Sequence, residues 1–271
     1  MKRPRALVTG ASKGIGLALA RGLATRGYDL LLSARSLAEL ESAAEAIRKE
    51  YSVQADVFPA DLSIPSQVQS LVDYARDRFA SELKILVNNA GYGMWGWFQT
   101  LPLEEQLRML HVNVQAPLIL SHAFLPILHQ NGPSYILNIS SSTAYQALPT
   151  MSVYAASKAF MVQMSRGLRQ ECQRQRLRVS VTCVSPGATK TNFIDRAGME
   201  PLRKMSDAVG MTPEAVARVA IKAMLAGKTE VVPGLVNKMG AALARYLPKK
   251  VAETAAGNIY VKKLADSNRS N

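Results

Sequence analysis

A tyrosine and a lysine four positions apart, Tyr154 and Lys158, are the residues with the clearest chemical potential. At this spacing two side chains share one face of a helix, one turn apart. A free phenol has a pKa of about 10, which is too high for an acid–base group at neutral pH. We expect the charge of Lys158 to favour the phenolate and to lower the pKa of Tyr154. Such a pair also occurs by chance on protein surfaces, so its meaning depends on its companions.

A glycine-rich loop near the N-terminus could hold a phosphate group. Gly10, Gly14 and Gly16 lie between an expected strand at 6–9 and an expected helix at 15–26. Glycines allow a sharp turn, and the helix N-terminus offers free N–H groups to an anion. The spacing G-x-x-x-G-x-G differs from the commoner dinucleotide fingerprint, and glycines can serve a turn for structural reasons alone. The strand–loop–helix context nevertheless favours a bound dinucleotide.

The end of the second expected strand bears on the choice between NAD and NADP. An acidic residue there binds the ribose 2′-hydroxyl of NAD, whereas a basic residue accommodates the 2′-phosphate of NADP. This chain has Arg35 at that point, and Lys13 adds a second positive charge from the glycine loop. Arg35 could instead simply begin the next helix in solvent. We favour the phosphate interpretation and therefore NADP(H).

Composition limits the class of protein. The chain has 271 residues, of which 48% are hydrophobic, as suits one α/β domain or at most two small ones. We find no signal peptide and no apolar run long enough to span a membrane. The two cysteines, Cys172 and Cys183, form no CxxC pair, so we expect a cytoplasmic protein. The net charge of +13 could attract anions, yet no nucleic-acid-binding motif accompanies it, and a solvated basic surface explains it equally well.

Short apolar runs alternate with longer helical stretches along the chain. We expect strands at 6–9, 29–34, 53–59, 85–88, 135–139 and 179–184, and helices at 15–26, 37–50, 65–79, 103–130 and 153–173. The helix at 103–130 should break or kink before Pro117. This alternation predicts an α/β fold with a single Rossmann-type, doubly wound parallel sheet and helices on both faces.

Further motifs follow in order: Asn88-Asn89-Ala90-Gly91, Asn113, Ser140-Ser141 and Pro186-Gly187. Together with the glycine loop and the tyrosine–lysine pair, they closely resemble the short-chain dehydrogenase/reductase family over about residues 5–230. The resemblance implies an NADP(H)-dependent oxidoreductase that interconverts a carbonyl and an alcohol without a metal. It also implies a homodimer or homotetramer built through the long helices at 103–130 and 153–173.

The same resemblance implies roles for individual residues. Tyr154 would protonate the carbonyl oxygen of the substrate as general acid. Lys158 would hold the ribose hydroxyls of the cofactor and lower the pKa of the tyrosine. Asn113 would anchor a water molecule in a proton relay that leads to Lys158. Developing negative charge on a carbonyl oxygen is stabilised by donors aimed at it, which agrees with these roles.

Ser141, thirteen residues before Tyr154, would hydrogen-bond the substrate oxygen, in preference to Ser140 or Ser142. Asp61 would contact adenine, and Thr191 would hold the nicotinamide carboxamide. Tyr154 and Lys158 would also touch the cofactor. The other implied cofactor contacts are Gly10, Ser12, Lys13, Gly14, Ile15, Gly16, Arg35, Leu62, Asn89, Ala90, Gly91, Pro186, Gly187 and Thr189.

Apolar side chains near these motifs bear on the substrate. They are Met94, Trp95, Trp97, Phe98, Tyr145, Met151, Phe193 and Ile194. They favour a lipophilic substrate, such as a 3-ketoacyl thioester, a ketosteroid or another bulky ketone, although core or subunit contacts would also explain them. The polar, weakly periodic segment 189–210 could be a substrate lid or an ordinary connection. Thr212 and Pro213 predict a helix start.

The domain prediction places the catalytic domain at 1–233 and a basic amphipathic extension, not an independent domain, at 234–271. The apolar face of the extension would carry Leu235, Val236, Met239, Leu243, Tyr246 and Leu247, beside Lys238, Arg245, Lys249 and Lys250. Peripheral contact with an anionic membrane is conceivable, but packing on its own domain or on another subunit is favoured. The tail after Lys263 should be disordered.

Two other functions remain open. Sugar-nucleotide epimerases also use a tyrosine and a lysine four apart, but with a different glycine spacing. A redox-sensing regulator would bind NADP(H) without turnover, and such relatives usually lose the tyrosine or the lysine. This chain keeps both, so the oxidoreductase remains the leading hypothesis.

Overall fold

The structure is a computed structural model. It describes residues 3–235, 237–240, 250–251, 253–254, 257–258, 260–261 and 263–264, with backbone only for 204–206. The strands are β1 (Arg5–Thr9), β2 (Asp29–Ala34), β3 (Ala55–Pro59), β4 (Leu83–Asn88), β5 (Ser134–Ile139), β6 (Val179–Val184) and β7 (Glu230–Val231). The α-helices are α1 (Gly14–Ala24), α2 (Leu37–Tyr51), α3 (Pro65–Phe79), α4 (Leu103–Leu110), α5 (Ala116–Asn131), α6 (Ser152–Arg174), α7 (Phe193–Ala197), α8 (Arg203–Val209) and α9 (Pro213–Leu225).

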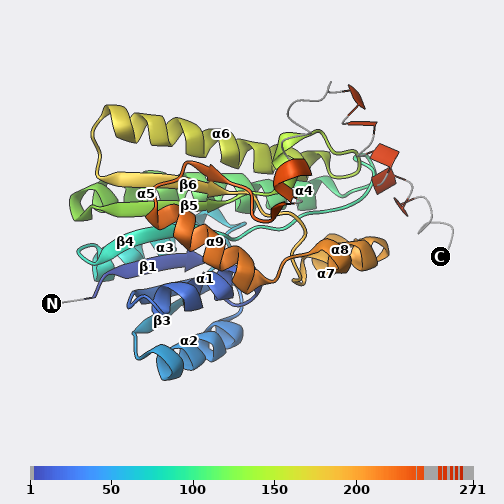
Figure 1. Cartoon of the computed structure of the whole chain (residues 1–271). Helices are drawn as coiled ribbons and strands as arrows, with labels where there is room; N and C mark the ends of the chain where they lie inside the picture. Colours follow the sequence, from blue (N-terminus) through green and yellow to red (C-terminus); the bar gives the residue numbers. More distant parts are fainter. Residues whose placement is uncertain are drawn as a thin grey trace.

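In the described part of the chain the strands form one parallel sheet in the order β3-β2-β1-β4-β5-β6-β7. The chain starts in the middle with β1, winds outward to β3 and then returns to place β4 on the other side of β1. Helices α1, α2 and α9 cover one face of the sheet, and α3, α5 and α6 cover the other (Figure 1). The predicted doubly wound Rossmann-type sheet in a single domain is confirmed.

Alternation along the strands explains why the sheet is covered on both faces. Successive side chains of a strand point to opposite faces. Leu7 packs in the cluster that includes α3, α5 and α6, whereas its neighbours Ala6 and Val8 pack in the cluster that includes α1, α2 and α9. All three are fully buried. A strand that is apolar on both sides must be shielded from water on both faces of the sheet, and the crossover helices form a layer on each face.

Most predicted elements match the structure within a few residues at each end, and two details differ. The interruption expected before Pro117 is present as a π-turn (His111–Gln115) between α4 and α5, and Pro117 occupies the first turn of α5. The segment 189–210 contains α7, a 3₁₀ turn and α8, each too short to show a helical period. The two-residue strand β7 was not predicted. Thr212 caps α9 as expected, because its side chain accepts the Ala215 N–H.

The joined helical segment Leu103–Asn131 is long and apolar enough to cross a membrane by length and composition alone, although the sequence analysis found no such stretch. In this structure it covers the sheet. Leu120, Phe124 and Leu128 of α5 are buried in the core cluster of that face. Its apolar composition is accounted for by this packing.

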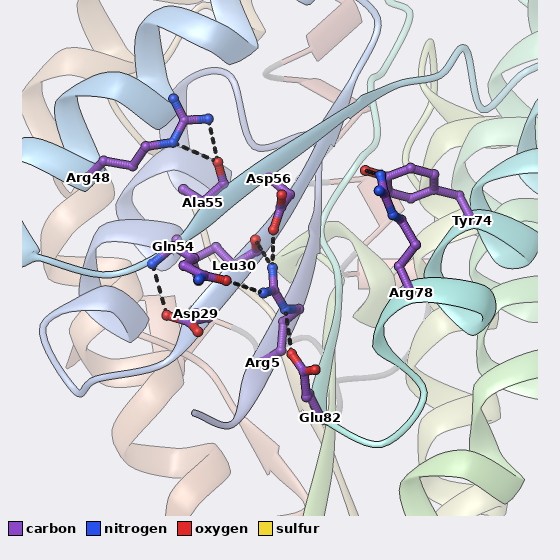
Figure 2. A network of polar contacts seen from close by, with 10 residues as sticks. All are labelled: Arg5, Asp29, Leu30, Arg48, Gln54, Ala55, Asp56, Tyr74, Arg78 and Glu82. Atoms are coloured by element: carbon purple, nitrogen blue, oxygen red, sulfur yellow. Dashed lines mark hydrogen bonds and ion pairs between the residues drawn. The ribbon is translucent and has the colours of Figure 1, made fainter. Parts of the chain in front are cut away.

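A buried arginine ties together the edge of the sheet where the strands begin. Arg5 of β1 is 1% exposed. Its hydrogen-bond and ion-pair partners are the Leu30 carbonyl oxygen, Gln54, Asp56 and Glu82 (Figure 2). The guanidinium also lies 3.9 Å from the ring centroid of Phe79. Leu30 lies in β2, Asp56 in β3, and Gln54 and Glu82 just before β3 and β4, so the Arg5 side chain links four segments. The two carboxylates compensate its buried positive charge.

The C-terminal part is described only in pieces. The expected apolar face is represented by Leu235 and Met239, which are both exposed, and its other four members lie outside the described residues. Tyr260 and Leu264 pack against the core cluster that contains α6. The predicted disorder after Lys263 does not hold for Leu264, which is buried by this packing, and residues 265–271 lie outside the described residues.

Candidate active site

The loops that follow the strands enclose a cavity of about 760 Å³ at the carboxyl edge of the sheet. Ligands of doubly wound sheets bind at this edge, where the strand order reverses between β1 and β4. Fifteen of the predicted site residues line the cavity: Gly10, Ser12, Lys13, Gly14, Ile15, Gly16, Arg35, Asp61, Leu62, Asn89, Ala90, Gly91, Tyr154, Lys158 and Thr191. Residues far apart in the sequence therefore meet in one place.

The turn and the close packing of the glycine loop both require glycine. Gly10 and Gly14 adopt positive φ values of 65° and 58°, which favour glycine. A Cβ on Gly16 would lie 2.0 Å from the Gly10 carbonyl oxygen. Lys13, at the N-cap of α1, makes no side-chain capping bond. The first N–H groups of α1 are thus left for an anion, so the loop fits the pyrophosphate of a dinucleotide.

Thr9, which the sequence analysis did not single out, fixes this loop to the neighbouring strand. Its hydroxyl donates to the Val87 carbonyl oxygen at 3.1 Å and accepts the N–H groups of Asn89 and Ala90. The Asn89 side chain donates in turn to the Thr9 and Gly10 carbonyl oxygens. The ends of β1 and β4 are therefore held together beneath the cavity. A threonine at the end of an apolar strand carries no distinctive sequence signal.

Tyr154 and Lys158 lie on the same face of α6, as predicted, and both are buried. The Lys158 ammonium lies 5.8 Å from the centroid of the Tyr154 ring and donates to the Ile139 carbonyl oxygen at 3.3 Å. Both side chains line the cavity. A phenol and an ammonium group thus face the same enclosed space.

Burial governs how these two groups titrate. It raises the pKa of Tyr154 to about 12, while a hydrogen bond with Ser141 acts in the lowering direction and Tyr260 adds a smaller raising effect. Burial also lowers the pKa of Lys158 to about 8. The expectation that Lys158 lowers the pKa of Tyr154 is therefore not met in this structure, because desolvation of the phenolate raises this pKa and Lys158 is not among the groups that shift it. The group that favours the phenolate here is Ser141.

Ser141 is distinguished from its neighbours by its contacts. The Ser140 hydroxyl donates to the Lys158 carbonyl oxygen at 2.7 Å, and the Ser142 N–H donates to the Pro186 carbonyl oxygen at 2.8 Å. Ser141 caps the short 3₁₀ turn Ser142–Tyr145 and is hydrogen-bonded to the Tyr154 side chain. It is not among the residues that line the cavity. Ser140 has its hydroxyl committed to the backbone, so Ser141 is the serine that can act together with the tyrosine.

Asn113 occupies the π-turn between α4 and α5 and is 1% exposed. Its side-chain amide donates to the Tyr92 carbonyl oxygen at 2.9 Å and to the Ser157 hydroxyl at 3.1 Å, and its oxygen accepts the Tyr92 N–H at 3.1 Å. A Cβ on Gly91 would lie 2.9 Å from this oxygen and 3.0 Å from Lys158 Nζ. The glycine thus allows Asn113 and Lys158 to approach the same point.

Three residues that the resemblance assigned to the cofactor do not line the cavity: Pro186, Gly187 and Thr189. A Cβ on Gly187 would lie 2.2 Å from Asn237 Oδ1, so this glycine allows the chain after β7 to approach. The Thr189 hydroxyl donates to the Gly187 carbonyl oxygen at 3.1 Å. These residues shape the loop after β6, whereas Thr191 reaches the cavity and lies against Gly14.

Helices α7 and α4 also line the cavity, and apart from Phe193 their lining residues were not predicted from the sequence. Phe193 packs against Tyr154 with 5.5 Å between ring centroids, and the Arg196 guanidinium lies 4.2 Å from the centroid of the Tyr92 ring. Glu105 and Arg108 line the cavity from α4. The missed lining residues also include Ser36, Glu39, Ser63, Lys190 and Asn192. The only available signal was the position of α7 inside the segment 189–210, which was proposed as a lid.

The aromatic and apolar residues proposed around the substrate lie in four different environments. Met94 and Phe193 line the cavity. Trp95, Met151 and Ile194 belong to the core cluster, and Trp97 and Phe98 are exposed. The Tyr145 hydroxyl is bonded to Ser185 and Glu230, away from the cavity. The apolar wall of the cavity is thus narrower than the sequence suggested.

The fold agrees with comparisons to known proteins. Residues 4–201 match the family described as short chain dehydrogenase. The chain belongs to this family and is an oxidoreductase of the short-chain dehydrogenase/reductase type.

Individual relatives give a finer picture. The chain is 31% identical over 229 residues to the ketoacyl reductase HetN of Nostoc sp., covering 83% of this chain and 77% of that protein. It is 31% identical over 220 residues to a very-long-chain 3-oxoacyl-CoA reductase of Anas platyrhynchos, covering 80% of this chain and 67% of the relative. Among solved structures, a short-chain dehydrogenase from Sphingobium yanoikuyae in complex with NADPH superposes with a TM-score of 0.79 at 29% identity, covering 91% and 97% of the two chains.

Proposed function

We propose that the protein is an NADP(H)-dependent oxidoreductase that interconverts a carbonyl and an alcohol in a lipophilic substrate. The observation that carries this proposal is the meeting of Tyr154 and Lys158 on one wall of the cavity, with Ser141 hydrogen-bonded to the tyrosine. The arrangement provides a proton donor, a hydroxyl that can hold the substrate oxygen and a nearby positive charge.

The residues around the cavity are suited to hold the cofactor. The N–H groups at the start of α1 would bind the pyrophosphate, and Lys13 and Arg35 would meet a 2′-phosphate. Thr191, which lies against Gly14, would contact the nicotinamide end. The relative from Sphingobium yanoikuyae holds NADPH, which supports this choice. When bound, the nicotinamide supplies or accepts the hydride.

The protein's own groups would handle the proton. In the reducing direction Tyr154 donates its phenolic proton to the carbonyl oxygen, and Ser141 hydrogen-bonds the same oxygen. Lys158 is mostly protonated at neutral pH because burial lowers its pKa only to about 8. Its ammonium group would hold the ribose hydroxyls of the cofactor, while Ser141 favours the phenolate that remains after proton transfer. Asn113 holds the Tyr92 backbone and Ser157 in place beside these groups.

The substrate class follows from weaker observations. Met94, Phe193 and Tyr92 give the cavity an apolar side. Two of the relatives are described as ketoacyl and 3-oxoacyl-CoA reductases. We therefore propose a lipophilic ketone, with 3-ketoacyl thioesters first among the classes to test. We also propose assembly into a homodimer or homotetramer, as the family resemblance implies.

The test is NADPH oxidation by the purified protein with 3-ketoacyl thioesters, ketosteroids, diketones, aldehydes and ketose sugars, with NADH in parallel. Turnover of one lipophilic class with NADPH preferred is the expected result. Tight binding of NADPH without turnover of any of these compounds would contradict the proposal and favour a sensor.

The variant Arg35→Asp tests the cofactor assignment. It replaces the fork of donors with a negative charge, so the preference for NADPH over NADH should fall by about ten- to a hundredfold. An unchanged preference would remove Arg35 from the phosphate site.

A further inference from the structure

A carboxylate lies among the basic residues at the adenosine end of the cavity. Glu39 of α2 lines the cavity together with Ser12, Lys13 and Arg35. Its Oε1 lies 3.2 Å from the Lys13 ammonium. Hydrogen bonds from Ser12 and Lys13, and then the charges of Lys13 and Arg35, hold the pKa of Glu39 below its usual value. The acid is therefore ionised beside both cations that the cofactor assignment uses.

The backbone holds Glu39 at this place. Ser36 caps α2 by accepting the Glu39 N–H at 3.3 Å, which makes Glu39 the third residue of the helix. A glutamate at that position commonly turns back to the capping residue. Here its carboxylate instead points across to Lys13 in the glycine loop. A purely helix-capping role would not require this contact.

The ion pair between Glu39 and Lys13 affects the binding of a 2′-phosphate and of a 2′-hydroxyl in opposite ways. A 2′-phosphate that approaches Lys13 has to replace the carboxylate and is repelled by it, since like charges at short range are unfavourable. The side chains of Glu39 and Lys13 are 46% and 60% exposed, so the pair can separate at modest cost. A ribose 2′-hydroxyl, in contrast, finds an acceptor in the same carboxylate.

We propose that Glu39 is a specificity-determining residue that weakens the preference for a 2′-phosphate and allows the site to accept NAD(H) as well. The inference rests on the cofactor site described under the proposed function and adds an opposing charge to it. The selectivity of this chain is then set by the balance of Glu39 against Lys13 and Arg35.

Binding of two nucleotide fragments tests the proposal without turnover. Adenosine 2′,5′-bisphosphate and adenosine 5′-monophosphate differ only in the 2′-phosphate, and calorimetry measures the Kd of each. In Glu39→Gln the bisphosphate should bind about three- to tenfold more tightly than in the wild type. The monophosphate should bind equally well or more weakly.

Glu41→Gln is the matched control. Glu41 lies on the same helix, is 3.6 Å from Arg48 and does not line the cavity. The two variants remove the same charge, so a specific effect must exceed that of Glu41→Gln. Equal effects in both variants, or weaker bisphosphate binding in Glu39→Gln, would overturn the inference. A second check is Lys13→Gln, in which the additional change Glu39→Gln should gain less than it gains in the wild type, because the ion pair is already absent.

The same measurements separate this inference from the proposed function. If the wild type binds both fragments equally, its preference for NADP(H) fails. A gain in bisphosphate binding by Glu39→Gln would then still support the role of Glu39. If the wild type prefers the bisphosphate and Glu39→Gln behaves like Glu41→Gln, only the role of Glu39 fails.

Discussion

The carboxamide of Asn113 and the backbone of Tyr92 form a closed pair of hydrogen bonds. Asn113 Nδ2 donates to the Tyr92 carbonyl oxygen at 2.9 Å, and the Tyr92 N–H donates to Asn113 Oδ1 at 3.1 Å. The π-turn makes this possible, because an extra residue in the turn shifts the side chain relative to a regular helix. The loop after β4 is thereby fixed to the helix that borders the active site.

Asn113→Asp should disturb this arrangement. Aspartate can accept the Tyr92 N–H but cannot donate to the Tyr92 carbonyl oxygen or to Ser157. We expect a loss of about 1–3 kcal/mol in the free energy of unfolding and at least a tenfold fall in kcat. Denaturant titration and steady-state kinetics measure the two effects.

Asn131→Asp is the control for that variant. Asn131 also donates from its side chain to two backbone carbonyl oxygens, those of Ala80 and Leu83, but at the opposite end of α5. It should lose stability and keep kcat. A similar fall in kcat in both variants would show that Asn113 acts only through general stability.

Tyr154→Phe should remove turnover and leave cofactor binding intact. The phenyl ring keeps the contact with Phe193 but has no proton to give. We expect kcat to fall by about a thousandfold and the Kd for NADPH to change by less than about threefold. Tyr74→Phe, on α3 and outside the cavity, should leave both unchanged. Substantial residual turnover would show that another group supplies the proton.

Lys158→Met should stabilise the protein at neutral pH while it removes activity. Burial lowers the pKa of Lys158 from 10.5 to about 8, so the folded state tolerates its charge poorly. Methionine removes that cost and should raise the free energy of unfolding by about 1–3 kcal/mol at pH 7.

The stability difference between Lys158→Met and the wild type should depend on pH. Between about pH 8 and pH 10 the unfolded lysine binds a proton that the folded lysine has lost, so the stability of the wild type rises with pH. The advantage of Lys158→Met should shrink over this range. Above pH 10 the raised pKa of Tyr154 acts in the opposite direction in both proteins. A constant advantage from pH 7 to 10 would exclude a buried ammonium as the cause.

Arg5→Met should destabilise the protein without changing the active site. The substitution leaves the Leu30 carbonyl oxygen, Gln54 and the carboxylates of Asp56 and Glu82 without the guanidinium. We expect a loss of about 2–4 kcal/mol in the free energy of unfolding and an unchanged Kd for NADPH. The exposed Arg78, which lies 5.4 Å from the ring centroid of Tyr74, offers the comparison Arg78→Met, which should cost less than about 1 kcal/mol. Equal losses would mean that the buried network adds nothing.

Much of the fold could be predicted because apolar runs and turn residues are local signals. The bounds predicted for β2, β6 and α3 are those found. The short α7 and α8 could not be predicted, since one or two turns show no period and depend on the surfaces they pack against.

In the candidate site, too, local patterns could be predicted and features that depend on packing could not. Tyr154 and Lys158 were found through their spacing, and the structure places them together. The sequence analysis expected a lowered pKa for Tyr154, whereas burial raises it. Burial is a property of the folded chain and could not be inferred from the spacing of the two residues. Glu39 was missed for a related reason: an acidic residue at the start of a helix looks like a helix-stabilising charge until its distance to Lys13 is known.

Strand β1 carries Arg5 at one end and Thr9 at the other. Arg5 belongs to the buried charge network, and Thr9 holds the glycine loop against the end of β4, next to the cavity. Arg5 and Thr9 are four residue steps apart, about 13 Å along the strand, which is beyond the range over which mutational effects usually couple. Changes at the two ends should therefore be additive. Substitutions near Arg5 can therefore change the free energy of unfolding, and substitutions near Thr9 can change activity, independently of each other. The two ends of this strand can be engineered separately.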